Sequence, residues 1–170
     1  MFQPKPISKD AIPAALMKAE RYRLLNEPGE AESICLDILH IEPSNQEALV
    51  SLVLALSDQF REETAASRTA ASRADEFLSR LSDEYDRLYY SGLIRERRAK
   101  AALQRDRYSA PHAAEWLREA MHFFERAEAV RPPHNDDAVL RWNACARTLN
   151  RHPEMHASSE EPPATLAPEW

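Results

Sequence analysis

Glycine is nearly absent from this sequence. The chain has 170 residues and only 2 glycines, Gly29 and Gly92. Because glycine supplies the backbone conformations of tight hairpin turns, β-bulges and phosphate-binding loops, its scarcity argues against a β-rich fold and against a glycine-rich nucleotide loop. Alanine, leucine, glutamate and arginine, which favour helices, are abundant instead. We therefore expect an all-α fold.

Basic charge and long apolar runs are also scarce. The formal net charge is -6 and the pI is about 5.6, whereas a nucleic-acid-binding protein needs a basic face to offset the phosphates. No window approaches the roughly 18 consecutive apolar residues of a membrane-spanning helix, and the first residues lack the apolar segment of a secretory signal. We expect no nucleic-acid partner, no membrane insertion and a cytoplasmic location.

Cysteine and histidine give no sign of a metal or redox site. The 2 cysteines, Cys35 and Cys145, lie far apart, and each falls within an apolar helical stripe, which is typical of core residues in a reducing compartment. His152 and His156 have the i, i+4 spacing that places two metal ligands on one helix face. Pro153 lies between them, however, at the edge of an acidic tail. We predict no metal site and no cofactor.

Catalytic motifs are missing as well. The sequence contains no G-x-S-x-G, Walker or H-E-x-x-H pattern. Its paired acidic residues, such as Asp136 and Asp137, fall at helix starts or in loops, where the helix dipole or solubility explains them. We therefore predict no catalytic residues and no enzymatic activity.

Apolar periodicity predicts seven helices. Asp10 is the expected cap of the first, with Pro13 in its first turn. Asn26, which tolerates the left-handed conformation, is expected to end that helix. Ser44 or Asn45 is expected to cap the third helix, and Asn135 the last. The predicted helices cover about 11–25, 30–42, 46–60, 73–81, 88–107, 111–130 and 136–150, with a long loop or frayed helix at 61–72 and a turn near 82–87.

The composition divides the chain into three parts. Residues 1–10 contain proline and lysine and are expected to be flexible, and residues 11–151 are expected to form one helical repeat domain. Residues 153–170 contain 4 prolines, 4 glutamates and no lysine or arginine. Because a segment with so few large apolar residues forms no core, we expect 152–170 to be a disordered acidic tail.

One predicted helical hairpin has small, aromatic and apolar residues at regular positions. They are Ala19 and Tyr22 in its first helix, Ala31, Cys35 and Ile38 in its second, and a closing Pro43. This pattern resembles a tetratricopeptide repeat, a helix-turn-helix unit of about 34 residues. The alanine that opens the second helix recurs at Ala74 and Ala120, after gaps of 43 and 46 residues. The residues in excess of the 34-residue period fall in two predicted interruptions, near 61–72 and 104–112, where repeat proteins accept insertions.

The resemblance implies a right-handed α-α superhelix of about three degenerate hairpins, with 136–150 as a C-terminal capping helix. An irregular helical bundle is the alternative. In this family the first helices of successive units line a concave groove that binds an extended or helical peptide. The positions that correspond to this groove hold Glu20, Arg23, Glu47, Val50, Leu54, Asp58, Tyr90, Leu93, Arg97, Lys100, Asn143 and Arg147.

One subgroup of the family clamps a terminal carboxylate with a lysine and an asparagine. Leu16 and Glu20 stand at those two positions here, which argues against that clamp. Basic residues are nevertheless concentrated between Arg87 and Arg107, where seven basic and two acidic residues give a local charge of +5. This run is either a solvated helix face or a lining for an acidic peptide or a terminal carboxylate.

These observations favour a protein–protein interaction scaffold or adaptor that binds a peptide or protein segment. One alternative is a small three-repeat chaperone for secreted or unfolded partners, which the size and acidity suit. Another is an enzyme or metal protein built on a helical bundle, although the sequence places no ionisable cluster together. The largely apolar segment 46–60 also suggests a homodimer that buries its excess apolar surface.

Overall fold

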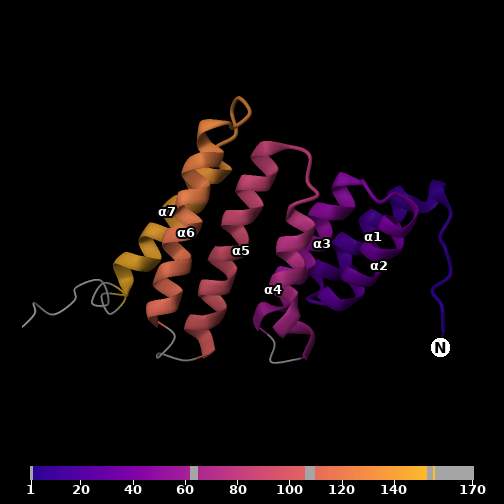
Figure 1. The fold of residues 1–170 in the computed structure, drawn as a ribbon, viewed down its shortest axis with the longest axis horizontal. Coiled ribbons are helices and arrows are strands. Elements are labelled where there is room, and N and C mark those ends of the chain that lie inside the picture. Colours follow the sequence, from indigo (N-terminus) through magenta and orange to yellow (C-terminus); the bar gives the residue numbers. More distant parts are fainter. Residues whose placement is uncertain (1, 62–64, 106–109, 153–154, 156–170) are drawn as a thin grey trace, which may run out of the picture.

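The computed structural model describes residues 2–61, 65–105, 110–152 and 155. These residues form helices and contain no strand, which confirms the all-α prediction. The helices run side by side in a row, from α1 and α2 at one end to α6 and α7 at the other (Figure 1). Their bounds are α1 Ile12–Leu24, α2 Pro28–Ile41, α3 Gln46–Asp58, α4 Ala65–Leu78, α5 Glu84–Arg105, α6 Ala110–Ala129 and α7 Asp137–Arg151, with short 3-10 helices at Lys9–Ala11 and Gln59–Arg61.

Local sequence signals set the first hairpin. Asn26 has a φ of 60°, which confirms it as the left-handed residue that ends α1. Pro28 occupies the start of α2, where its missing N–H costs little, so α2 begins there rather than at residue 30. The Asn45 side chain caps α3 by accepting a hydrogen bond from the Ala48 N–H at 2.9 Å, as predicted.

Two other predicted caps lie differently. Asp10 is part of the 3-10 turn before α1, and Ala11 takes the N-cap position without a side-chain hydrogen bond. Asn135 precedes the N-cap residue of α7, which is Asp136. Its side chain still accepts a hydrogen bond from the Asp137 N–H at 2.9 Å. The asparagine therefore stabilises the helix start from one position further out than expected.

Of the two alternatives predicted for 61–72, a loop or a frayed helix, the loop is wrong from Ala65 on, and so is the predicted helix start at 73. After the 3-10 turn Gln59–Arg61, α4 begins at Ala65, and residues 62–64 lie outside the described part. Ala70, Ala74 and Leu78 recur at i, i+4 spacing and are buried in the first core. Small residues make up most of this stripe, so its periodicity is weak although alanine has the highest helix propensity.

The turn between α4 and α5 also lies earlier than predicted. α4 ends at Leu78, and α5 begins at Glu84. The Asp83 side chain accepts a hydrogen bond from the Asp86 N–H at 2.9 Å, which is the hydrogen bond of a helix N-cap. Tyr85 therefore belongs to α5 and not to the predicted turn.

Two hydrophobic cores follow one another along the row. The first lies among α1, α2, α3 and α4, and the second among α5, α6 and α7. α5 contributes to both, since Ile94 and Ala101 belong to the first core, and Leu88 and Ala99 to the second. This long helix therefore joins the two halves of the protein.

Both predicted flexible ends contribute packed residues. Ile7 packs against the first core, and Lys9 pairs with Glu42 at 3.2 Å. Beyond α7, Met155 is buried in the second core. Apart from His152 and Met155, the predicted acidic tail lies outside the described residues, at 153–154 and 156–170.

The alanines expected to open each repeat unit are buried. Ala31, Ala74 and Ala120 are each 0% exposed. The family resemblance requires such burial, but ordinary helical bundles bury alanines in the same way. The repeat and its superhelical form therefore stay predictions.

Gly92 allows α5 and α6 to approach each other closely. A Cβ atom at this position would lie 2.7 Å from Cε1 of Phe124. The Phe124 side chain is 1% exposed, so surrounding atoms restrict its movement. The second core contains further small residues from the same two helices: Ala99, Ala102, Ala113, Ala114 and Ala120.

We predict that Gly92→Ala lowers the free energy of unfolding by about 1–3 kcal/mol. The clash with Phe124 outweighs a gain in helix propensity of about 1 kcal/mol. Urea denaturation followed by circular dichroism measures the change. Gly29→Ala is the control, because nothing lies within 4 Å of its added Cβ, and it should leave stability unchanged or raise it. Equal destabilisation by both substitutions would contradict the close packing at Gly92.

Candidate functional site

The basic residues of α5 do not form one exposed face. Arg95 pairs with a carboxylate of α4 at 2.8 Å, Arg98 lies over a tryptophan ring of α6, and Arg105 donates to a backbone carbonyl of the second 3-10 turn. These contacts attach α5 to its neighbours. Arg107 lies outside the described residues. The basic residues of the run that line a pocket beside α1 and α3 are Arg97 and Lys100.

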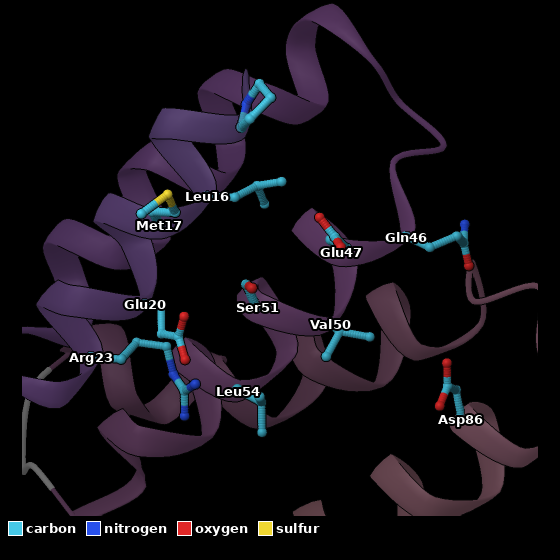
Figure 2. Close-up of a pocket in the computed structure, with 11 residues that line it drawn as sticks. Leu16, Met17, Glu20, Arg23, Gln46, Glu47, Val50, Ser51, Leu54 and Asp86 are labelled. Carbon is cyan, nitrogen blue, oxygen red and sulfur yellow. The ribbon is translucent and has the colours of Figure 1, made fainter. Parts of the chain in front are cut away.

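An open groove with a volume of about 580 Å³ lies between α1, α3 and the start of α5. Figure 2 shows α1 on one side of it and Asp86 of α5 on the other, with the side chains of α3 between them. Met17 is 68% exposed here, so the chain leaves a large apolar side chain uncovered. We call this surface the apolar groove; it is lined by Pro13, Leu16, Met17, Glu20, Arg23, Gln46, Glu47, Val50, Ser51, Leu54 and Asp86.

A polar pocket with a volume of about 340 Å³ adjoins the groove, and Arg23 lines both. It lies among the C-terminal ends of α1 and α3, the middle of α5 and the first half of α7. Five cationic side chains and two carboxylates line it, so its net charge is +3 in a chain whose net charge is -6. We call it the basic pocket; its charged residues are Arg23, Arg61, Arg97, Lys100, Arg141, Asp58 and Glu96.

Asp58 positions two of these arginines. The Nε of Arg23 donates to Asp58 Oδ2 at 2.8 Å, and Arg97 Nη1 pairs with Asp58 Oδ1. Arg97 also donates to the Ser57 hydroxyl at 2.6 Å. Burial lowers the pKa of the Arg97 guanidinium, and the charge of Asp58 opposes that shift. One carboxylate of α3 thus holds arginines from α1 and α5.

Glu96 lines the same pocket and has one unpaired side-chain oxygen. The residue is 0% exposed, and its Oε1 pairs with Lys100 and, at 3.5 Å, with Arg141 of α7. Its Oε2 has no hydrogen-bond partner within the described part of the chain. A buried carboxylate oxygen without a donor is unfavourable.

Most of the predicted groove residues gather at these two surfaces. The expected positions on α1 and α3 face the apolar groove, and those at the end of α3 and in the middle of α5 face the basic pocket. The groove contains the predicted residues Glu20, Arg23, Glu47, Val50 and Leu54, and the pocket contains Arg23, Asp58, Arg97 and Lys100.

Four predicted groove residues lie elsewhere. Leu93 is 3% exposed, so the prediction that it faces a partner is wrong. Tyr90 packs against the first core. Arg147 lines a separate depression beside α5, and Asn143, half-buried on α7, lines neither the apolar groove nor the basic pocket. Leu93 lies on the same helix face as Arg97 and Lys100, but other parts of the protein cover it near the start of α5.

Four charged residues of the site were not predicted from the sequence. Asp86 was assigned to a turn, whereas it lies in the first turn of α5 and lines the groove. Glu96 counted only as an acid within the basic run. Arg61 and Arg141 are brought to the pocket by tertiary packing, from the turn after α3 and from α7. No local spacing in the sequence indicates these neighbours.

The cysteines are core residues, as predicted, because Cys35 and Cys145 are both 0% exposed. Burial raises the pKa of each thiol to about 12, so the reactive thiolate is scarce at neutral pH. Within the described part of the chain, no group of three or more His, Cys, Asp or Glu residues is placed to hold a metal ion. His156, half of the candidate histidine pair, lies outside that part.

We predict that neither cysteine of the folded protein reacts with a thiol reagent at pH 8. Burial and the raised pKa of each thiol both suppress attack by the thiolate. Release of the chromophore from Ellman's reagent measures the reaction, and the same protein in guanidinium chloride should show two reactive thiols. Rapid modification of the folded protein would contradict the burial.

We predict that Asp58→Ala lowers the free energy of unfolding by about 2 kcal/mol, because it leaves Arg23 and Arg97 close together without their shared carboxylate. Urea denaturation measures the loss. Glu128→Ala is the control, since Glu128 pairs with Arg131 on the exposed end of α6 at 3.5 Å and should contribute less than about 1 kcal/mol. Similar effects of the two substitutions would show that Asp58 has no special role.

The apolar side chains of α3 are buried within a single copy of the protein. Leu49, Leu52 and Val53 are each 0% exposed. The excess apolar surface that suggested a homodimer is therefore covered by the first core. Val50 and Leu54, on the same helix, stay partly exposed and line the apolar groove.

No family model matches the chain, and neither a curated protein nor a solved structure matches it. Among the described helices, none is both long and apolar enough to cross a membrane. The tetratricopeptide resemblance therefore stays a prediction, and a function has to be inferred from the geometry of the groove and the pocket.

Proposed function

We propose that the protein binds a segment of a partner protein along the apolar groove and the basic pocket, and thus acts as a scaffold or adaptor. The observation that carries this proposal is the uncovered apolar surface around Met17, Val50 and Leu54, which continues into a pocket of opposite charge to the chain. Concave apolar surfaces with a few charged groups are typical of binding sites.

The order of the helices supports a groove for a peptide. α1, α3 and α5 are the first helices of the three expected repeat units, and these helices surround the apolar groove. In the resembled family, first helices line the peptide-binding surface. The proposal rests on this surface and does not require that the repeat be regular.

The lining of the basic pocket supports binding rather than catalysis. Ser57 is the hydroxyl residue in it, and its Oγ donates to the Leu54 carbonyl at 2.8 Å while it accepts from Arg97. A serine nucleophile needs an adjacent general base, and no histidine is found among the described residues that line either surface. Arginines in such a pocket are suited to holding a carboxylate.

A display library of random peptides, selected on the folded protein, tests the proposal. We predict that selected peptides bind Met17→Glu about tenfold more weakly than the wild type, because a charge replaces an apolar contact in the groove. Fluorescence anisotropy with labelled peptides measures the affinities. Met17 is 68% exposed, so the substitution should leave the fold intact, which circular dichroism verifies.

Leu140→Glu is the matched control. Leu140 is 63% exposed, close to the exposure of Met17, but it lies on α7 and lines neither the apolar groove nor the basic pocket. This variant should keep the wild-type affinity. If Met17→Glu binds the selected peptides as tightly as Leu140→Glu does, the groove is not the binding site.

A further inference from the structure

The groove and the pocket carry opposite charges, and this difference bears on the partner. We infer, resting on the proposed function, that the site selects a segment with charges in a fixed spatial order: a lysine or arginine at the apolar groove, apolar residues in the middle, and an aspartate or glutamate in the basic pocket. The occupant is a segment of a partner protein with separated charges.

Three helices bring carboxylates to the apolar groove. Glu20 comes from α1, Glu47 from α3 and Asp86 from α5 (Figure 2). Glu20 and Glu47 are exposed, and burial, together with the charge of Asp83, raises the pKa of the Asp86 carboxyl. A cation that binds in the apolar groove would favour the charged form of Asp86, because a nearby positive charge lowers the pKa of a carboxyl. Arg23, the basic residue of the groove, is already engaged with Asp58.

The basic pocket has more cations than its own carboxylates neutralise. Asp58 is shared by Arg23 and Arg97, and Glu96 is shared by Lys100 and Arg141. Each carboxylate therefore leaves one positive charge unbalanced, and the nearby Arg61 adds another. Arginine and lysine side chains grouped in this way attract a carboxylate and form charge-assisted hydrogen bonds with it.

The acidic side chain of the segment is assigned to the arginines and the lysine of the basic pocket. Glu96 Oε2 takes no part in this contact, because it is buried as well as unpaired within the described part of the chain.

Along α3 the order is Glu47, then Val50 and Leu54, then Asp58 of the basic pocket. Asp86 and Arg97 follow the same order along α5, whereas Glu20 lies one turn from Arg23 (Figure 2). Leu16, Val50 and Leu54 line the groove, and Arg23 lies where it adjoins the pocket. A segment that fills the groove with apolar side chains would thus place its two ends against opposite charges. Such an arrangement rejects partners of the wrong charge order, because like charges brought together in an interface are unfavourable.

Three labelled peptides test the charge order. The bipolar peptide has two lysines, a leucine-rich centre and two glutamates; the scrambled peptide has the same composition with lysine and glutamate mixed at both ends; the acidic peptide has glutamates at both ends. We predict that the wild type binds the bipolar peptide about tenfold more tightly than either of the others, by fluorescence anisotropy at low ionic strength. The preference should shrink at high ionic strength because salt screens exposed charges.

Charge reversal in the protein gives the decisive comparison. Glu47→Lys should lose the preference for the bipolar peptide and bind the acidic peptide more tightly than the wild type does. Glu30→Lys is the matched control, because Glu30 is also exposed and in the first turn of a helix but lines neither surface. It should keep the wild-type order of affinities.

The outcomes separate this inference from the proposed function. If the three peptides bind equally, or if none of them binds, the charge order is overturned even when display-selected peptides still depend on Met17. If display-selected peptides ignore Met17→Glu, the proposed function itself fails.

Discussion

The ion pairs of Asp58 tie together the three helices that surround the candidate site. Arg23 of α1 and Arg97 of α5 both bind this one carboxylate of α3. Without it, two guanidinium groups would face each other beside a partly buried surface, where repulsion between like charges is weakly screened. The apolar groove and the basic pocket adjoin at Arg23, so the same contact also fixes where the charge of the site changes sign.

Much of the fold could be predicted from local signals in the sequence. Asn26 and Asn45 act within one or two residues of their own position, through a left-handed backbone and a side-chain cap. The sequence was less informative where the signal depends on packing. The stripe of α4 consists largely of alanine, whose helix propensity is high but whose contribution to apolar periodicity is small, and the helix was therefore predicted to start late.

In the candidate site, too, residues set by local signals could be predicted, and residues set by packing could not. The predicted positions on α1 and α3 lie where expected, because the starts and ends of these helices were marked by asparagine and proline. Leu93 was misplaced because the helical period gives the face of α5 that carries Arg97 and Lys100, but does not show that packing covers this face closer to the start of the helix. Glu96 and Arg141 meet across α5 and α7, and the pairing of two charged residues 45 positions apart leaves no periodic trace in one sequence.

The placement of the site across the two cores has a consequence for the cooperativity of unfolding. α1 and α3 belong to the first core and α7 to the second, while α5 takes part in both. Halves that pack separately in this way open as separate units when their local stabilities differ. A segment that touches α3 and α7 at once binds when both units are closed, so its binding free energy couples them. Occupancy by a partner would then determine whether the chain unfolds in one step or in two.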